Sequence, residues 1–383
     1  MPYQTELSGL QPPFPNLGLI EGFFGKGWSW EARARYAQWL PRHGYGFYIY
    51  APKEDGYLRK HWALPWPEAE LEALRKHWAL PWPEAELEAL RQLARQCRDN
   101  GLAFGVGLSP MGAHHDYDRK RPALLEKVRL IDEALQPDIL AVLFDDMKGD
   151  TPDLAHHQLT IAHDIAAHSK AGRLIFCPSY YSTDPVLEKV FGAMPPRYLE
   201  DIGQQLDRRF EIFWTGPRVC SSEYPAPHLK QVTELLGRKP FLWDNYPVND
   251  GSKASSFLHL RAFENRPAEL VELVAGHAVN PMKQAALSVL PLATLPMSYR
   301  LGKQYDADKA LHASLNATCG PQISAMIEAD LPLFQDMGLA LLTQEQIAHL
   351  KRRYLPFQDQ VCVNEILRWL AGEYVFDPDC LTD

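Results

Sequence analysis

Short apolar segments alternate with longer segments of helical periodicity along residues 17–300, and this alternation constrains the fold more than any other feature. The expected strands are Leu17–Glu21, Gly46–Tyr50, Leu102–Leu108, Ile139–Phe144, Arg173–Cys177, Phe210–Trp214, Phe241–Trp243 and, more weakly, Gly276–Val279. Several are apolar at nearly every position, which is typical of parallel strands covered on both faces. Alternating strands and helices form right-handed βαβ units. We therefore expect an α/β fold in which residues 1–300 form a (β/α)8 TIM-type barrel.

Helical periodicity fills the gaps between these strands. The expected helices are Trp30–His43, Glu84–Asp99, Pro122–Leu135, Pro152–Lys170 and Ala226–Leu236, with a further one inside Pro185–Leu206. A doubly wound sheet is the rival arrangement, because it also alternates strands and helices. Its dinucleotide-binding form carries a Gly-x-Gly-x-x-Gly turn after the first strand, and this chain has no such motif there. The barrel is therefore the preferred prediction.

The strand pattern stops after Tyr299, and the remaining sequence is helical in character. The expected helices are Asp308–Thr318, Ile323–Met337, Thr343–Tyr354 and Gln358–Tyr374. The sequence Thr-Gln-Glu-Gln from Thr343 has the form of a capping box, which favours a helix start at that point. We predict a small C-terminal α-helical domain over residues 301–383.

Composition indicates a folded protein and argues against two classes of partner. The chain has 383 residues, of which 46% are hydrophobic, and its 39 basic and 48 acidic residues give a net charge of −9. No basic stripe is present to neutralise phosphates, so we expect no nucleic-acid partner. No apolar run approaches the ~20 residues of a membrane span, and Met1–Leu10 does not resemble a signal peptide. We therefore expect no membrane association.

The cysteine pattern favours a reducing compartment. Six cysteines are scattered along the chain without a Cys-x-x-Cys pair, which argues against a zinc ribbon or a dense disulfide framework. Free thiols in a cytoplasmic protein are the expected state. Aromatic residues make up 11% of the chain, and many lie beside Gly, Pro, Asn or Asp. Such loop aromatics favour a site that stacks flat ligands, sugars among them, although core packing explains any single one.

A 16-residue sequence occurs twice in tandem over residues 59–90 without a single difference. Arg59–Leu74 has the sequence RKHWALPWPEAELEAL, and Arg75–Leu90 repeats it. Two copies are too few for a solenoid, which needs at least three. Pro81 and Pro83 prevent one helix from running through both copies. We expect one copy to keep the native loop and helix start. The other is then a neutral bulge from a recent duplication or from construction of the sequence, and a lid over the site is the alternative.

Two adjacent acidic residues follow the apolar segment that begins at Ile139. Asp145 and Asp146 then lie at the carboxyl end of a strand, which is the active-site face of a (β/α)8 barrel. Like charges so close should split their pKa values, leaving one ionised and one available as an acid. Adjacent strand residues point to opposite sides, so we expect the pair to touch different atoms of one ligand. A helix cap or turn, or a metal site with His114 and His115, remains an alternative.

Two further loops carry polar and glycine residues after candidate strands. In Phe241–Asp250 an apolar strand leads into two Asn and two Asp among aromatic residues, which suits sugar hydroxyls and amides but also ordinary turns. In Leu17–Ser29 a strand leads into a loop rich in Gly and aromatic residues, where backbone can approach a ligand. This loop lacks the spacing of a phosphate-binding loop.

Taken together, these pieces resemble glycoside hydrolase family 84, the O-GlcNAcase and bacterial β-N-acetylglucosaminidase family, which is sometimes labelled hyaluronidase. Eight motifs carry the resemblance in order between about Leu17 and Tyr299. They are IEGFFGKGWS at Ile20–Ser29, YAPKED at Tyr50–Asp55, GLSP at Gly107–Pro110, LFDDM at Leu143–Met147, FCPSYY at Phe176–Tyr181, FWTGP at Phe213–Pro217, LWDNYPVND at Leu242–Asp250 and NPM at Asn280–Met282.

The resemblance implies a retaining exo-β-N-acetylglucosaminidase that needs neither a metal nor an organic cofactor. Such enzymes release terminal β-linked N-acetylglucosamine from a glycoconjugate or oligosaccharide by substrate-assisted catalysis, an exception to the scheme with two catalytic carboxylates. The 2-acetamido oxygen of the sugar attacks the anomeric carbon and forms an oxazoline intermediate. By resemblance, Asp145 polarises the acetamido N–H, and Asp146 protonates the leaving oxygen and later deprotonates water.

The same motifs imply a set of sugar-binding residues. They are Gly22 through its backbone, Lys53 near the sugar hydroxyls, Tyr181 at the acetamido oxygen, Trp214 and Trp243 around the acetamido methyl, Asn245 near the acetamido group or leaving oxygen, and Asp250 and Asn280 at the outer hydroxyls. An internal nucleophile works only when it is held against the anomeric carbon, which gives a physical reason for a Tyr and two aromatic walls.

Some positions depart from the usual family pattern. Phe24 stands where Tyr is common, Gly27 stands where Pro is common, and Met111 separates Pro110 from Gly112. These changes affect loop shape and substrate choice. They leave open a catalytically silent barrel that only binds N-acetylglucosamine. A metal-dependent hydrolase that uses Asp145, Asp146 and His114 is a third hypothesis.

Overall fold

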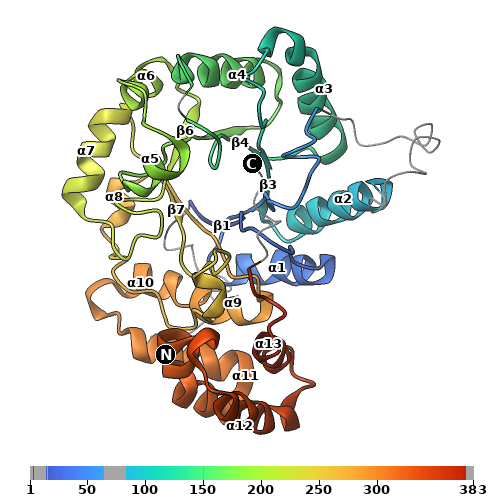
Figure 1. The fold of residues 1–383 in the computed structure, drawn as a ribbon, viewed down its shortest axis with the longest axis vertical. Coiled ribbons are helices and arrows are strands. Elements are labelled where there is room, and N and C mark those ends of the chain that lie inside the picture. The colour runs from blue at the N-terminus through green and yellow to red at the C-terminus, as the bar shows by residue number, and fades with distance from the viewer. Residues whose placement is uncertain (1–2, 4–13, 15, 64–82, 150, 377–383) are drawn as a thin grey trace.

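Eight parallel strands form a closed barrel in the computed structural model, which describes residues 3, 14, 16–63, 83–149 and 151–376. The strands are β1 (Leu17–Glu21), β2 (Phe47–Tyr50), β3 (Ala103–Leu108), β4 (Ile139–Leu143), β5 (Arg173–Cys177), β6 (Phe210–Trp214), β7 (Phe241–Asp244) and β8 (Gly276–Val279). Each strand pairs with the next in sequence, and β8 pairs with β1. Figure 1 looks along this barrel, with its helices in an outer ring. The predicted (β/α)8 fold is confirmed.

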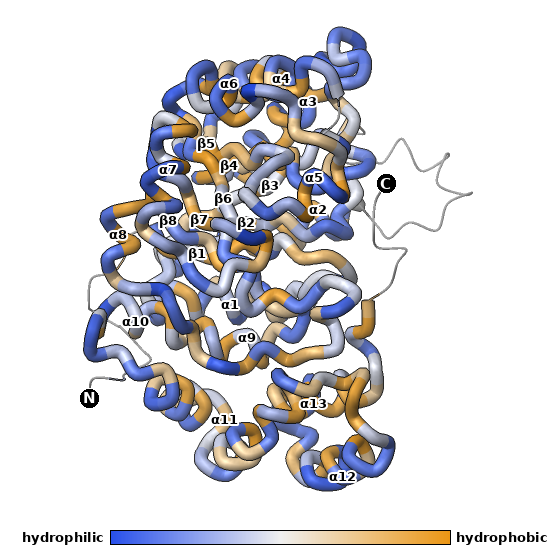
Figure 2. The backbone as a smooth tube through the Cα atoms, turned by 60° about the vertical axis from the view of Figure 1, so that its left-hand side comes forward, coloured by the Kyte–Doolittle hydropathy of each residue, from blue (hydrophilic) through white to orange (hydrophobic). Residues whose placement is uncertain are grey.

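The strands are buried because helices cover them outside and side chains fill the barrel inside. Every residue of β1, β2, β4, β7 and β8 is buried. Apolar residues gather along the strands in Figure 2. Packing is tight enough to require glycine: a β-carbon on Gly276 would lie 2.2 Å from the ring of Phe241 on the neighbouring strand. The continuous apolar pattern of the sequence therefore reflects burial on both faces.

The barrel helices agree closely with the helical segments expected from the sequence. They are α1 (Trp30–Arg42), α2 (Pro83–Asp99), α3 (Tyr117–Leu135), α4 (Leu154–His168), α5 (Val186–Phe191), α6 (Tyr198–Gln205), α7 (Ala226–Leu236), α8 (Leu270–Leu273), α9 (Ala285–Leu292) and α10 (Leu295–Leu301). The segment Pro185–Leu206 holds two short helices, because Gly192 ends the first with a positive φ of 94°. Helices α8, α9 and α10 were not expected from the sequence, because α8 has only four residues and α9 and α10 are buried on nearly all sides.

The C-terminal region is helical as predicted and packs around a second hydrophobic core. Its helices are α11 (Ala307–Leu331), α12 (Gln344–Tyr354) and α13 (Val361–Leu370), and the capping box at Thr343 is present. Helix α11 joins both expected segments across Gly320, where φ is 75°. The second core also includes barrel-side residues such as Leu287 and Leu290 of α9. In Figure 1 these helices lie beside α9, below the barrel. The division between residues 1–300 and 301–383 stays a prediction.

The two repeat copies contribute different parts of the fold. Arg59 and Trp62, from the start of the first copy, are buried against the barrel, and Trp62 Nε1 donates to the carbonyl of Met111 at 2.9 Å. Helix α2 begins at Pro83, inside the second copy. Residues 64–82 lie outside the described residues, and with them the predicted bulge. No helix in the described ranges is long and apolar enough to cross a membrane.

Candidate active site

Two adjacent carboxylates lie directly beyond the end of β4. The strand ends at Leu143, and Asp145 and Asp146 belong to the turn that follows, where φ of Asp146 is 60°. The carboxyl ends of all eight strands share this face of the barrel. The expectation that the two side chains point to opposite sides is wrong, because the backbone has already left the strand conformation. Both carboxylates instead reach the same ammonium group.

Lys53, in the segment after β2, supplies that ammonium group. Its Nζ donates to Oδ2 of Asp145 and lies 3.1 Å from Oδ2 of Asp146. The Lys53 side chain is only 3% exposed. Its Nζ also lies 5.7 Å from the ring centroids of Phe24 and Trp243. One cation therefore links the segments after β1, β2 and β4 with Trp243 of β7.

The two carboxyl groups have pKa values displaced in opposite directions. Burial dominates at Asp145 and raises its pKa above the ordinary 3.8, although Lys53 opposes the shift. Burial acts in the same direction on Asp146, but the charges of Lys53 and Arg59 outweigh it and lower its pKa. The expected split is therefore present. Asp145 therefore holds a proton more readily than Asp146, because Lys53 and Arg59 both lie within ion-pair distance of Asp146 in this structure. The resemblance assigns the acid role to the other residue, Asp146.

Tyr181 approaches the pair from the segment after β5. Its hydroxyl donates to Oδ1 of Asp146 at 3.5 Å, and the side chain is buried. Burial raises the pKa of Tyr181 well above its ordinary value, so the phenol stays a neutral donor. Oδ1 of Asp145, in contrast, is buried and has no hydrogen-bond partner among the described residues. The pair therefore has one acceptor atom that no residue in the described ranges uses.

Four of the predicted sugar-binding residues form one hydrogen-bonded group at the ends of β1, β7 and β8. The backbone N–H of Gly22 donates to Oδ1 of Asn280 at 3.2 Å. Oδ1 of Asn245 accepts from Nδ2 of Asn280 and from Nε1 of Trp243, both at 3.0 Å. Asn245 also donates to the carbonyl of Val219 at 2.9 Å. This group holds the indole of Trp243 in place beneath Lys53.

The remaining two predicted binding residues have separate surroundings. Oδ2 of Asp250 accepts from the backbone N–H of Phe24 at 2.8 Å, and burial raises the pKa of Asp250 above its ordinary value. Trp214 is completely buried at the end of β6, and its Nε1 donates to Nε2 of His228 at 3.1 Å. Asp250 therefore ties its loop to the glycine-rich loop after β1. Trp214 is fixed toward α7, and no described hydrogen bond joins it to the carboxylate pair.

Comparison with known proteins identifies the family. A family model described as beta-N-acetylglucosaminidase matches residues 17–76 and 72–330, two overlapping pieces that meet inside the repeated sequence. The chain belongs to the β-N-acetylglucosaminidase family. This membership places it among the glycoside hydrolases, and the matched residues include every strand of the barrel.

Named relatives of this β-N-acetylglucosaminidase family member agree with the assignment. Two proteins called protein O-GlcNAcase, from Rattus norvegicus and Mus musculus, are each 28% identical over 294 residues. That match covers 74% of this chain but 30% of each relative, so the chain spans less than a third of their length.

Solved structures of similar fold include a mutant of the Thermobaculum terrenum O-GlcNAc hydrolase. It has a TM-score of 0.71 and 26% identity, and the match covers 94% of this chain and 75% of that chain. The protein CpGH84B has a TM-score of 0.73 and 21% identity, with 94% and 67% of the two chains covered, and this likeness concerns the fold alone.

Three buried charged groups were not identified from the sequence, two of them at strand ends and one in the segment after β2. Arg59 lies 3.9 Å from Oδ2 of Asp146, and no local pattern marks it. Glu21 ends β1 and forms two hydrogen bonds with Arg33, at 2.7 and 2.9 Å. Asp244 ends β7 and is held by Arg266 at 2.8 Å through both oxygens. An apolar strand that ends in an acidic residue was a usable signal for the last two, and both are completely buried in ion pairs.

Two of the sequence departures from the family pattern have a visible structural consequence. The ring of Phe24, which stands where Tyr is common, lies 4.9 Å from Cζ of Arg59 and 5.7 Å from Nζ of Lys53. The backbone N–H of Gly27 donates to Oε1 of Glu54 at 2.6 Å. A proline at that position has no N–H to donate. Both residues therefore affect the shape of the loop that joins β1 to α1.

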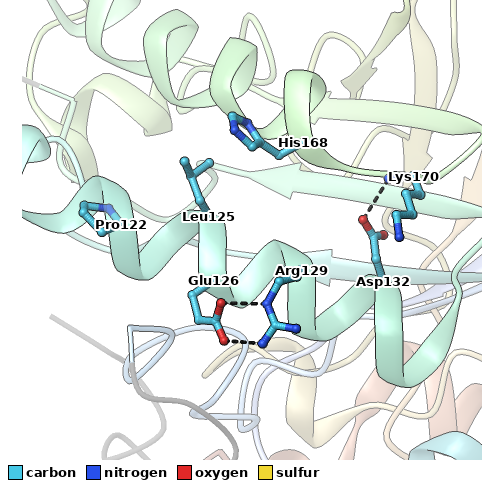
Figure 3. A pocket seen from close by; sticks show the side chains of 7 residues that line it. All are labelled: Pro122, Leu125, Glu126, Arg129, Asp132, His168 and Lys170. Atoms are coloured by element: carbon cyan, nitrogen blue, oxygen red, sulfur yellow. Dashed lines mark hydrogen bonds and ion pairs between the residues drawn. The ribbon is translucent and has the colours of Figure 1, made fainter.

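The histidines near the barrel face do not join the carboxylate pair through any described contact. The ring of His114 lies 3.9 Å from that of His115 and 6.5 Å from that of His157. Within the described ranges, no three His, Cys, Asp or Glu side chains are grouped to hold a metal ion. A separate pocket of about 310 Å³ lies between α3 and the end of α4, lined by residues that include Asp132, His168 and Lys170 (Figure 3). It shares no lining residue with the pair.

Proposed function

We propose that this protein is a retaining exo-β-N-acetylglucosaminidase, similar to O-GlcNAcases, that hydrolyses terminal β-linked N-acetylglucosamine through an oxazoline intermediate. The observation that carries the proposal is the buried pair Asp145 and Asp146 at the carboxyl end of β4, in a chain of the β-N-acetylglucosaminidase family. The two carboxylates are adjacent in sequence and share one lysine, so they lie side by side rather than on opposite sides of a bound sugar. Such an arrangement suits a reaction in which the substrate supplies the nucleophile.

Each carboxylate has a distinct task in this proposal. Asp145 accepts the acetamido N–H, and its buried Oδ1 is an acceptor that no described residue uses. For this step Asp145 is ionised in the substrate complex, which reverses the order of proton affinities in the free protein. Its negative charge polarises the N–H bond and pushes electron density toward the acetamido oxygen, which attacks the anomeric carbon as the glycosidic bond breaks. Asp146 gives its proton to the leaving oxygen and later removes a proton from the water that opens the oxazoline. These steps need no metal ion or organic cofactor.

The other predicted residues position the sugar. The hydroxyl of Tyr181 donates a hydrogen bond to the acetamido oxygen. Trp214 and Trp243 form apolar walls around the acetamido methyl, and Asn245 lies beside the acetamido group or the leaving oxygen. Gly22 contacts the sugar through its backbone. Lys53, Asp250 and Asn280 bind the outer hydroxyls of the sugar. Support comes from the hydrogen bonds that connect Gly22, Asn280, Asn245 and Trp243, since a rigid wall keeps an internal nucleophile aligned.

The proposed substrate is a glycoconjugate or oligosaccharide that ends in β-N-acetylglucosamine, and protein-linked sugar is the class suggested by the relatives' names. We also propose a cytoplasmic location. All five cysteines in the described ranges are free thiols, which suits a reducing compartment. Immunoblots of soluble and secreted cell fractions test the location, and recovery of the protein from the secreted fraction contradicts it.

The first experiment measures release of a chromogenic aglycone from its β-N-acetylglucosaminide and from the matching β-glucoside, both in excess chelator. We expect hydrolysis of the first only, because the glucoside lacks the acetamido nucleophile. Equal hydrolysis of both contradicts the substrate-assisted mechanism. Binding of N-acetylglucosamine by folded protein without any hydrolysis favours the alternative, a catalytically silent binding barrel. Loss of activity in chelator alone favours a metal-dependent hydrolase.

A further inference from the structure

Arg59 is a buried cation whose hydrogen-bonding groups are unused. Its side chain is 3% exposed, and Nε, Nη1 and Nη2 have no hydrogen-bond partner among the described residues. The guanidinium lies over the ring of Phe24, with Cζ 4.9 Å from the centroid. Within the described part of the chain it forms an ion pair with Asp146, where Nη2 lies 3.9 Å from Oδ2. That distance is too long for a direct hydrogen bond.

Such a group requires an explanation, because a guanidinium carries five N–H donors and buried donors are almost always satisfied. The guanidinium of Arg59 lies 3.9 Å from Oδ2 of Asp146, whereas the ammonium of Lys53 lies 3.1 Å from the same oxygen. Lys53 also donates to Asp145. An ammonium has three donors, so a contact with a sugar hydroxyl leaves Lys53 at most one donor for each carboxylate.

We propose that Arg59 is a positioning residue for Asp146, which holds this carboxylate when Lys53 turns toward the sugar. The inference rests on the proposed function, in which Lys53 contacts sugar hydroxyls. Among the described residues, Arg59 and Lys53 are the cations within ion-pair distance of Asp146. A closing movement of the guanidinium by about 1 Å brings its donors to hydrogen-bond distance.

This position matters most at the moment of proton transfer. As the glycosidic bond breaks, the proton of Asp146 passes to the leaving oxygen, and the electron pair of the O–H bond stays on the Asp146 carboxylate. A cation held this close stabilises that new charge with little reorganisation, so it lowers the barrier rather than strengthening substrate binding. The same cation releases its hold when Asp146 takes a proton from water in the second step.

Other titratable groups also face Asp146. They are Lys53 after β2, Asp145 beside it, Cys177 and Tyr181 on and after β5, and Asp250 after β7. Burial raises the pKa values of Cys177 and Tyr181 well above their ordinary values, so both stay neutral. A substitution at Arg59 leaves each of these groups in place, which makes the effect of its charge measurable.

The test compares the parent protein with R59M, R59K and R59Q in pH profiles of kcat/KM. The substrates are two β-N-acetylglucosaminides, one with an activated aryl leaving group and one with an alkyl alcohol as leaving group. Loss of a neighbouring positive charge raises the pKa of Asp146, so we expect the alkaline limb of R59M to move up by about one pH unit. We expect the alkaline limb of R59K to lie where it does in the parent, because lysine keeps the positive charge. In R59M we expect kcat/KM to fall at least tenfold more for the alkyl glycoside than for the aryl glycoside.

Two controls separate this role from others. R91M removes one positive charge from an exposed position of α2, and we expect it to leave both profiles unchanged. Circular dichroism and thermal unfolding check each fold, and R59Q replaces R59M if the methionine variant does not fold. An equal loss of rate on both substrates with an unmoved alkaline limb overturns the proposal in favour of a structural role.

Two further outcomes are decisive. A third substrate carries a carboxylate on its aglycone. If R59M loses rate on this substrate alone and its alkaline limb does not move, the proposal is overturned and Arg59 binds substrate anions instead. If the parent hydrolyses neither substrate, the proposed function fails. Arg59 is then tested by carbon-13 NMR titration of the Asp146 carboxyl carbon, where R59M must titrate at higher pH than the parent. An identical titration overturns the proposal.

Discussion

The indole of Trp243 fills the space that a side chain on Gly22 would occupy. A β-carbon on Gly22 would lie 2.5 Å from Cζ2 and 3.0 Å from Cη2 of Trp243. The strand-end backbone of β1 and the aromatic wall of β7 therefore meet directly, and the Gly22 N–H is free to bond Asn280. The packing explains why glycine stands at this position, where φ is not positive.

A Gly22→Ala variant tests this contact. The methyl group displaces the indole, and overpacking of this kind costs about 1–3 kcal/mol of stability. We expect a raised KM for N-acetylglucosaminides together with a lower melting temperature. Gly172→Ala is a matched control, because Gly172 is exposed, has no positive φ, and the nearest atom to its β-carbon position is the carbonyl oxygen of Asp138 at 3.9 Å. An unchanged KM in Gly22→Ala contradicts a role for Trp243 at the sugar.

Asp146→Asn tests the acid and base assignment. The amide cannot donate a proton as an acid does, so we expect kcat/KM to fall by about 10²–10⁴-fold on an alkyl glycoside. An activated aryl glycoside needs little protonation of its leaving group, and its first step should be much less affected. The measurement is the ratio of rates on the two substrates. A similar loss on both substrates argues against Asp146 as the proton donor.

Asp145→Asn is expected to behave differently. An amide lacks the negative charge that stabilises the acetamido group as it becomes an oxazoline, and one such electrostatic contact is worth about 10²–10³-fold in rate. The first step should slow to a similar extent for both leaving groups. Pre-steady-state release of the aglycone measures that step. Rates equal to those of the parent would remove Asp145 from the mechanism.

The ion pair between Asp244 and Arg266 should stabilise the barrel in a pH-dependent way. Although burial opposes ionisation of Asp244, Arg266 and His277 lower its pKa from 3.8 to about 2. The folded protein therefore favours the carboxylate, and the stabilisation is complete above about pH 4 and lost as the pH falls toward 2. Burial lowers the pKa of His277, so neutral His277 donates Nε2–H to Asp244 at 3.0 Å.

Arg266→Met checks this expectation. It leaves a buried carboxylate without its cation, and such a change costs about 3–5 kcal/mol at pH 7. Denaturant unfolding measures the difference between parent and variant at several pH values. The difference should begin to shrink above pH 4 and continue to shrink toward pH 2, because burial without Arg266 raises the pKa of Asp244 in the variant and protonated Asp244 no longer needs the cation. A difference that does not vary with pH counts against the ion pair as its source.

Removal of one repeat copy tests the duplicated segment. Deletion of Arg59–Leu74 and deletion of Arg75–Leu90 give the same chain, which keeps an arginine, a tryptophan and the α2 start in their original order. We expect an unchanged melting temperature and unchanged hydrolysis, because the fold draws on the start of one copy and the end of the other. A large loss of activity at unchanged stability supports a lid instead.

The candidate site was only partly predictable from individual residues. The pair Asp145 and Asp146 was identified because an apolar strand ends in two acidic residues, which is a local pattern. Its geometry was mispredicted, because the turn at Asp146 has a positive φ that strand alternation does not include. Arg59 was missed, since neither its burial nor its distance from Asp146 leaves a mark on nearby sequence.

The sequence by itself determined the order of the eight strands, most of the barrel helices and the helical character of the C-terminal region. Periodicity and caps act within a few residues, so each element carries its own signal. Tertiary structure decided which charges meet: Lys53 lies 92 positions from Asp145, and Gly22 lies 258 positions from Asn280. Closure of the barrel brings these residues together. The resulting burial and opposing charges, rather than residue type, set the proton affinities of the two carboxylates.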